Sequence, residues 1–244
     1  MGKFFLYAVT AIWTLSASAA EPRAIGRIIS ANKHLWPMKI DGSHARDVVV
    51  GGPVYEDDLF ETSFRQSLGI EFEDKTKIVL GAKTQLSLAD WNKRDKQGFL
   101  TRRVFLKAGL ARVLVQKVYS QSEPFIVESP FGAVSVQGTE FVFEVLLKKA
   151  VELDVISGRV TFAKTVQALT LENEYVIVSG GRKSLVSAPM ARPKPPLQFE
   201  LAALHRLLTQ NKMEFKIEAP TKRQPAEVPV KRRAQEMFKG GEHR

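Results

Sequence analysis

The chain has 244 residues, with 36 Lys and Arg against 26 Asp and Glu, and it contains no cysteine. Without cysteine it forms no disulfide, no thiolate metal site and no cysteine nucleophile, which excludes disulfide-stapled folds, zinc ribbons and cysteine hydrolases. The length suffices for one large domain with appended segments or for two small domains.

The first twenty residues have the pattern of a secretory signal peptide. A basic start precedes an apolar run from Phe4 to Leu15, and the small residues that follow offer cleavage after Ala19 or Ala20. The run is short for a transmembrane helix, so an uncleaved anchor is the weaker alternative. We expect residues 1–20 to be a signal peptide and the mature chain to have no transmembrane helix. We expect export to the periplasm, with the cell exterior or the envelope as alternatives.

Residues 21–188 have the pattern of short strands separated by turns. Apolar residues alternate with polar or small ones in runs such as Leu68–Phe72 and Phe141–Val145, which is typical of strands with one buried face. Gly, Pro and Asp separate these runs at intervals of about ten residues. The sequence shows no repeat of fixed period. This pattern predicts an all-β domain, an irregular β roll or a β-solenoid-like stack.

The most informative stretch of this domain is Ser129–Phe143. Two alternating runs meet there at Gly138-Thr139. A glycine between strands supplies a bulge or a close backbone approach that a side chain would block. The stretch contains no catalytic group, so it predicts a structural joint.

The composition changes near residue 189. Seven of the 12 prolines lie between residues 189 and 229, and their cluster predicts an extended linker at 189–196. The segment 197–216 then has the leucine spacing of an amphipathic helix, whose apolar face either packs on its own domain or binds a partner protein. The leucines that form this face are Leu197, Leu201, Leu204 and Leu208. Residues 217–244 are rich in proline and charge and predict a basic, disordered tail.

The positive charge of the protein is concentrated near its C-terminus. Residues 182–244 hold 14 Lys and Arg against six Asp and Glu. Such a segment attracts acidic polymers or lipid surfaces, although a tail that only keeps the protein soluble has the same composition. Nucleic acid is not expected as a partner, because no recognised binding motif accompanies the charges. The candidate polyanion-binding residues are Lys222, Arg223, Lys231, Arg232 and Arg233.

The sequence offers no credible catalytic or metal-binding set. Its four histidines lack the i, i+4 spacing of a helical zinc site, and no serine has the Gly-x-Ser-x-Gly context of a nucleophile elbow. The acidic run Glu56–Asp58 lacks the alternating pattern of a calcium loop and instead predicts a turn closed by aspartate hydrogen bonds. We expect no enzyme, no metal and no cofactor.

Six segments carry a resemblance to a known family: Ala24–Ile28, Val50–Thr62, Ile70–Ile78, Lys107–Arg112, Pro124–Phe141 and Val155–Val160. They resemble the FecR-domain family. Val50–Thr62 resembles the opening of the family pattern, Ile70–Ile78 its strand, turn and strand element, and Val155–Val160 its closing Gly-x-Val. The most specific likeness is that of Val127–Phe141 to the family signature Val-x-Thr-Pro followed by Val-Arg-Gly-Thr-x-Phe. The motif residues that this chain shares are Pro130, Gly138, Thr139 and Phe141.

The likeness covers roughly residues 24–165, with Ser129 where the family has Thr and Gln137 where it has Arg. It implies a non-catalytic periplasmic β module that senses or binds something. Membrane-bound regulators of this family place a cytoplasmic anti-sigma segment and a transmembrane helix before the domain. Only three residues precede the apolar run here, so we expect a stand-alone exported FecR-like domain without the anti-sigma segment.

The resemblance implies a binding or signal-sensing accessory module in signal transduction. An unidentified envelope protein is the expected partner, because a stand-alone domain need not keep the outer-membrane transporter that its membrane-bound relatives bind. The alternative is an envelope-associated protein that binds acidic cell-wall or lipopolysaccharide polymers through its basic C-terminal region.

Overall fold

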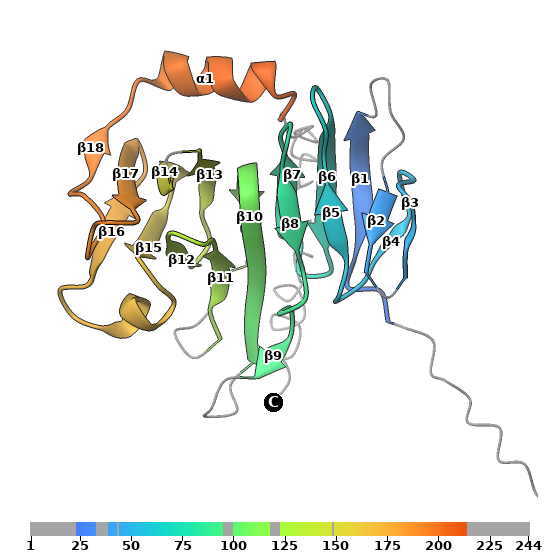
Figure 1. The fold of residues 1–244 in the computed structure, drawn as a ribbon, viewed down its shortest axis with the longest axis horizontal. Helices are drawn as coiled ribbons and strands as arrows, with labels where there is room; N and C mark the ends of the chain where they lie inside the picture. The colour runs from blue at the N-terminus through green and yellow to red at the C-terminus, as the bar shows by residue number, and fades with distance from the viewer. Residues whose placement is uncertain are drawn as a thin grey trace, which may run out of the picture. The chain divides into compact units, whose positions relative to one another are not determined.

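Two β-sheets share one hydrophobic core in the computed structural model (Figure 1). The structure describes residues 23–32, 39–42, 44–94, 100–117, 123–147 and 149–213. The predicted signal peptide and the predicted basic tail lie outside the described residues.

In the described residues, sheet A and sheet B each contain nine strands and have one strand, β10, in common. Sheet A has the order β4 (Pro53–Val54), β1 (Gly26–Asn32), β6 (Ser67–Phe72), β7 (Lys77–Leu80), β10 (Leu100–Leu114), β13 (Glu140–Leu146), β14 (Ala150–Ser157), β17 (Arg182–Ser187) and β18 (Leu197–Gln198). Sheet B has the order β3 (Arg46–Asp47), β2 (Lys39–Asp41), β5 (Leu59–Glu61), β8 (Gln85–Ser87), β10, β11 (Phe125–Glu128), β12 (Ala133–Val136), β15 (Arg159–Ala163) and β16 (Tyr175–Ser179). The remaining elements are β9 (Lys93–Arg94), which pairs with the start of β10, the 3-10 helix η1 (Gln167–Thr170) and the helix α1 (Leu201–Gln210).

The two sheets are joined through β10. Residues 102–108 of this strand pair with β8 and β11 in sheet B, and residues 109–114 pair with β7 and β13 in sheet A. The change of sheet follows an irregularity between Leu106 and Ala108. Buried Thr84 lies beside this point, because its hydroxyl donates to the carbonyl of Leu110 at 3.2 Å and accepts the Leu110 N–H at 3.0 Å.

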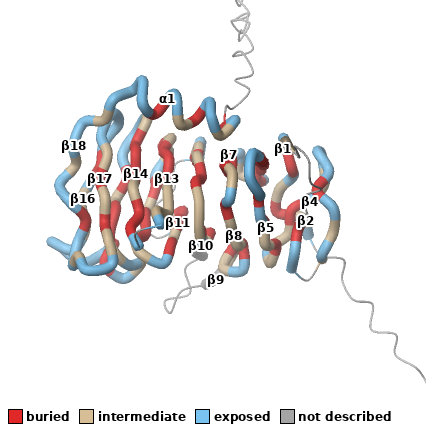
Figure 2. The backbone as a smooth tube through the Cα atoms, turned by 45° about the horizontal axis from the view of Figure 1, so that its top comes forward, coloured by how far each residue is buried: buried red, intermediate tan, exposed pale blue. Residues whose placement is uncertain are grey.

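One core fills the space between the sheets. It contains six fully buried phenylalanines, and Phe143 of sheet A meets Phe162 of sheet B edge to face at 6.2 Å. Each such side chain contributes about 1.5–3 kcal/mol by leaving water. Buried positions recur along the strands from one end of the stack to the other (Figure 2).

The all-β prediction is confirmed. The predicted alternation of buried and exposed positions is wrong for the strands at Phe141–Val145 and Leu68–Phe72. Val142 is buried between Phe141 and Phe143, and every residue of Ser67–Phe72 is buried, because both faces of these strands are covered. The finer expectation of a solenoid-like stack is not confirmed. Neighbouring strands are antiparallel except for the pair β10 and β11, whereas coils of a solenoid stack parallel strands. The chain passes from one sheet to the other after every one or two strands and adds to both sheets in the same direction.

The predicted joint at Gly138-Thr139 is one of three adjacent crossings between the sheets. The chain passes from β12 to β13 at this joint, from β14 to β15 at Gly158, and from β16 to β17 at Gly180-Gly181. Gly138 and Gly158 have φ of +70° and +84°, which favour glycine. A Cβ on Gly158 would lie 2.6 Å from Thr139 Cγ2 and 2.9 Å from the Gly138 carbonyl oxygen. The crossing at Gly158 can therefore lie this close to the joint at Gly138-Thr139 only because glycine occupies it.

The C-terminal part of the described chain differs from its prediction. The segment predicted as a linker at 189–196 lies along β17: the Lys194 N–H donates to the Leu185 carbonyl at 2.9 Å, and Pro193 is buried. Leu197 is in β18 rather than in the helix, because the extended backbone after the proline cluster pairs with β17. The helix α1 begins at Leu201, so the prediction of a helix from Leu197 was wrong at its start.

Replacing Gly158 tests the close stacking of the crossings. Gly51 is the matched control, since its φ of +87° is similar but no heavy atom lies within 4 Å of an added Cβ. We expect Gly51→Ala to lower the free energy of unfolding by about 1–2 kcal/mol through backbone strain. Gly158→Ala should cost about 2 kcal/mol more through overlap with Thr139. Urea unfolding measures both, and equal losses would contradict the stacking.

Candidate functional site

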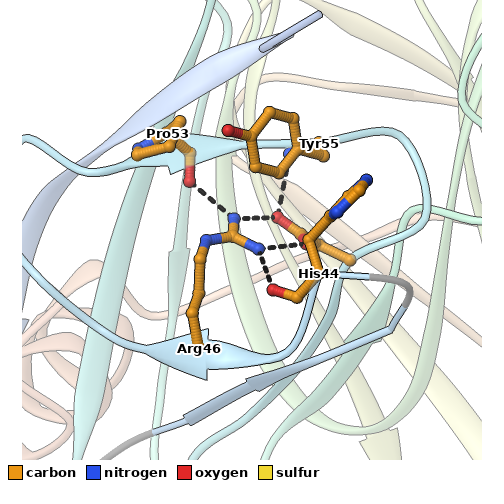
Figure 3. Close-up of polar contacts among 5 residues, drawn as sticks. His44, Arg46, Pro53 and Tyr55 are labelled. Atoms are coloured by element: carbon orange, nitrogen blue, oxygen red, sulfur yellow. Dashed lines mark hydrogen bonds and ion pairs between the residues drawn. The ribbon is translucent and has the colours of Figure 1, made fainter. Parts of the chain in front are cut away.

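A buried ion pair joins β3 to the loop between β4 and β5. The guanidinium of Arg46 donates to both carboxylate oxygens of Asp58, at 2.8 and 2.6 Å, and also to the carbonyls of His44 and Pro53 (Figure 3). The Asp58 side chain is fully buried, and the ring of Tyr55 lies 4.7 Å from the guanidinium carbon. A bidentate pair whose two terminal guanidinium nitrogens each make a further hydrogen bond is strong and directional. We call these contacts the Arg46–Asp58 clasp.

The clasp fixes the turn that carries Glu56. Asp58 accepts the Tyr55 N–H at 2.8 Å, and its own N–H donates to the Tyr55 carbonyl at 3.3 Å. The predicted turn closed by an aspartate side chain is therefore confirmed. From this turn the Asp58 carbonyl accepts the Leu88 N–H at 3.0 Å, and the Leu88 carbonyl accepts the Trp91 N–H at 2.8 Å. The clasp is thus linked by backbone hydrogen bonds to Trp91.

Trp91 forms the floor of a cavity of 390 Å³. Its ring stacks on Phe72 at 4.2 Å, with the Arg102 guanidinium carbon 5.9 Å from it, and Trp91 is only 4% exposed. The cavity lies among loops from β1, β4–β5, β6–β7 and β8–β9 and the start of β10. Its lining residues are Arg23, Ile25, Glu56, Glu73, Asp74, Trp91, Asn92 and Arg102. We call it the Trp91 pocket.

Charges of both signs surround the Trp91 pocket. Arg23 pairs with Glu73 at 3.0 Å in solvent, Arg102 Nε lies 3.9 Å from Asp74, and Asn92 donates to Glu56. Three carboxylates and two guanidiniums can therefore hydrogen-bond donors and acceptors of a ligand at the same place. The buried indole is a wall and offers no free face for stacking. Binding of a polar ligand is the chemistry that this arrangement supports.

A second charged group lies on the face of sheet A that points away from the core. Glu144 of β13 is directly opposite Glu152 of β14, and Lys183 of β17 lies 3.2 Å from Glu152. Burial, with the charge of Glu152 second, raises the pKa of Asp154 to about 6. Burial and the same neighbour also raise the pKa of Glu144. Like charges paired across strands destabilise the folded state.

On the same face, Glu71 of β6 has a lowered pKa, in contrast to Glu144 and Asp154. Burial by itself would raise the pKa of its carboxyl, but hydrogen bonds and charge from Arg27, at 2.8 Å, and Lys77, at 3.4 Å, hold the pKa below the usual value. Glu71 is only 8% exposed, so this charge is held in place by its two basic neighbours rather than by water.

The four motif residues hold the fold and do not converge on a cavity. Pro130 is exposed in the turn between β11 and β12, which the Ser129 hydroxyl closes on Gly132 at 2.8 Å. Thr139 is buried at the crossing, where its carbonyl accepts the Val115 N–H at 2.8 Å. Phe141 is fully buried in the core. The fourth motif residue is Gly138, described above.

The four leucines predicted to bind a partner differ in their exposure to solvent. Leu204 and Leu208 are buried, whereas Leu197 and Leu201 are each 63% exposed. After α1, Met213 is fully buried, its carbonyl accepts from Arg112 at 2.8 Å, and its sulfur lies beside Gly81. The inward face of α1 therefore packs on its own domain and is not free for a partner.

Several predicted features lie outside the described residues. They include the five candidate polyanion-binding residues Lys222, Arg223, Lys231, Arg232 and Arg233. Across the described ranges, no three His, Asp or Glu side chains are arranged to hold a metal ion. No helix in this part of the chain has the length and apolar character needed to cross a membrane.

Sequence reasoning missed the Trp91 pocket and the clasp. The lining of the pocket comes from positions 23 to 102, so only the fold brings it together. Asp58 was placed in a turn, but its partner Arg46 lies twelve residues earlier on another strand. A lone tryptophan among charged residues near position 91 was the only sequence signal for the pocket.

Replacing Asp58 tests how much the clasp contributes to the free energy of unfolding. Asp58→Ala leaves the largely buried Arg46 without its partner, so we expect the free energy of unfolding to fall by about 3–5 kcal/mol. Glu73→Ala is the control, because it breaks an exposed ion pair of the same pocket and should cost less than about 1 kcal/mol. Urea unfolding measures both values. Similar losses would show that the clasp contributes no more than a surface pair.

Asp154 predicts a pH dependence of stability. Its pKa is raised from 3.8 to about 6 in the folded state, so the folded state binds more protons than the unfolded state between these values. Stability from this group is complete below about pH 4 and is lost as the pH rises through 6. Asp154→Asn should stabilise the protein at pH 8 by up to about 3 kcal/mol and change little at pH 4.

Urea unfolding from pH 4 to 8 measures this difference, with the exposed Asp47→Asn as control. The control should follow the unchanged protein at every pH. An Asp154→Asn curve that also runs parallel to the unchanged protein would contradict the raised pKa.

Comparison with known proteins gives one family model and two solved structures of low similarity. Residues 58–161 match the family described as FecR protein. Two structures of a candidate anti-sigma factor from Parabacteroides distasonis ATCC 8503, at 1.65 and 2.50 Å, align with 15% identity and a TM-score of 0.47. The alignments cover 62% of this chain and 63–64% of those chains, less than two thirds of their length.

No curated protein matches the chain. The family match begins at Asp58, contains the crossing at Gly138-Thr139, and ends in β15. The resemblance drawn from the motif residues is therefore confirmed. The chain carries a FecR domain at residues 58–161.

Proposed function

We propose that this chain is a non-catalytic periplasmic binding module that senses a signal and passes it to an envelope protein. The observation that carries the proposal is the FecR match over residues 58–161. The family is regulatory and belongs to signal transduction. The signal-peptide pattern of residues 1–20 supports the periplasm as the compartment.

The Trp91 pocket is the part of the surface that we assign to binding. Loops held by a rigid scaffold are the usual place of binding residues, and the clasp and its backbone hydrogen bonds make these loops rigid. The pocket mixes carboxylates and guanidiniums around an apolar wall. Such a lining suits a segment of polypeptide, which also presents both donors and acceptors.

In the alternative function, the basic C-terminal region binds the protein to the cell envelope. The observation that favours it is the excess of 14 Lys and Arg over six Asp and Glu in residues 182–244. In this case the ligand is an acidic cell-wall or lipopolysaccharide polymer. Binding of that kind weakens steeply as salt is added.

Photo-cross-linking in intact cells tests the binding module. A photoreactive residue replaces Glu73, which is half-exposed at the rim of the Trp91 pocket, or the fully exposed Leu147 as control. We expect an adduct with a specific envelope protein from position 73 and none from position 147. Asp58→Ala in the same chain should reduce the adduct several-fold, because it releases the loops of the pocket.

Sedimentation with purified lipopolysaccharide and cell wall distinguishes the alternative function from the binding module. Met213 is buried and bonded to Arg112, so a chain ending at Met213 removes residues 214–244 without disturbing this contact. Salt-sensitive sedimentation that is lost with residues 214–244, together with no adduct at position 73, would favour the alternative. Absence of any adduct would contradict the proposed binding module.

A further inference from the structure

One edge of sheet B is unlike the other edges of the two sheets. In the described part of the chain, sheet A ends on β4 and β18, and sheet B ends on β3 and β16. Natural sheets protect their edges with proline, charge or very short strands. The edge strand β4 begins with Pro53, β18 follows Pro196, and β3 consists of Arg46 and Asp47 alone. The five-residue strand β16 has none of these devices.

The backbone of β16 is directed outward for further pairing. The Gly180 N–H donates to the Gly158 carbonyl at 3.0 Å. Every second residue back along the strand, Val178 and then Val176, is paired with β15 in the same way. In an antiparallel pair these residues bond to β15, so the alternate residues present their N–H and C=O groups to the open side. The alternate residues are Tyr175, Ile177 and Ser179. The Ile177 side chain is 50% exposed.

Charges at the two ends of β16 are of opposite sign. Glu172 and Glu174 lie just before the strand. Arg182 follows it after the crossing, and Arg159 of β15 is opposite Ser179. All four charged side chains are exposed, and none forms an ion pair with another described residue. The edge is thus apolar in its centre, acidic at its start and basic at its end.

We propose that β16 pairs antiparallel with β16 of a second copy of this chain, about a two-fold axis at Ile177. In this arrangement Tyr175 of each copy is opposite Ser179 of the other. The acidic start of each strand then lies beside the basic end of its partner, twice in one dimer. A parallel pairing would bring like charges together and is disfavoured. The charge pattern therefore selects a second copy and its orientation.

The pairing joins the two B sheets into one continuous sheet. Val176, which is only partly buried, lies opposite Val178 of the second copy, so the apolar inner face continues across the seam. The contact is one short strand from each copy, which is small for a protein interface. The dimer is therefore expected to be weak and to be seen at high protein concentration.

Sedimentation velocity of the full chain, up to about 0.5 mM, measures the self-association. We expect a concentration-dependent dimer that Ile177→Lys weakens at least about tenfold, because a charge then stands at the centre of the seam. Val49→Lys is the control, since Val49 is 59% exposed in a loop and lies outside β16. Thermal unfolding should change little in either variant, because both side chains are half-exposed or more.

Charge reversal tests the orientation. Glu172→Lys with Glu174→Lys makes both ends of β16 basic, and Arg159→Glu with Arg182→Glu makes both ends acidic. Each doubly substituted chain should associate more weakly with itself than the unchanged chain. An equimolar mixture of the two should recover dimers, because each basic end then meets an acidic one.

A disulfide reports the register, because the natural chain has no cysteine. Ile177→Cys should form a linked dimer under mild oxidation, since residues opposite each other in antiparallel strands lie within disulfide reach. Val49→Cys should not. A chain that stays monomeric, a dimer unaffected by Ile177→Lys, or equal linking of the two cysteine variants would each overturn the proposal.

Discussion

The hydrogen bonds of β10 are the constraint on which the rest of the structure depends. This strand completes sheet B with its first half and sheet A with its second half. Both sheets therefore face one core from the middle of the chain outward. The crossings at Gly138-Thr139, Gly158 and Gly180-Gly181 then carry the chain between the sheets, and at Gly158 the neighbouring crossing leaves no room for a side chain. Packing of the aromatic core follows from these two features.

The ends of the stack have different chemistry. At the end that contains the first strands, the clasp and the Trp91 pocket place charges of both signs on loops with little freedom. At the other end, β16 leaves an apolar edge open. The helix α1 runs from β18 toward β7 and buries Leu204 and Leu208 against its own domain (Figure 1). Recognition of a ligand and association of copies can thus use separate surfaces. Neither requires a catalytic group, which fits a domain of the FecR family.

The sequence was sufficient for the features that depend on local pattern. Alternation at Phe141–Val145 predicted a strand but not that Val142 is buried on its other face, and Asp58 predicted its turn. The leucine spacing did not show that Leu197 belongs to a strand and Leu201 to a helix. A leucine in a short strand just before a helix can lie four residues from the first leucine of that helix, as it would within one helix. The pairing of Arg46 with Asp58 and the assembly of the Trp91 pocket depend on strand order. Strand order is set by contacts between distant residues, which no local pattern records.

The position of β10 also determines when the two sheets can be completed during synthesis. A growing chain that ends before residue 100 contains β7 and β8, whose partner on one side has not been made. Both sheets then have exposed interior edges at the same time, and these edges are prone to aggregation. Addition of residues 100–114 covers β7 and β8 in one step, and β10 is then the open edge of both sheets until β11 and β13 are made. The nascent chain therefore needs protection of its strand edges from the synthesis of β7 until β13 is complete.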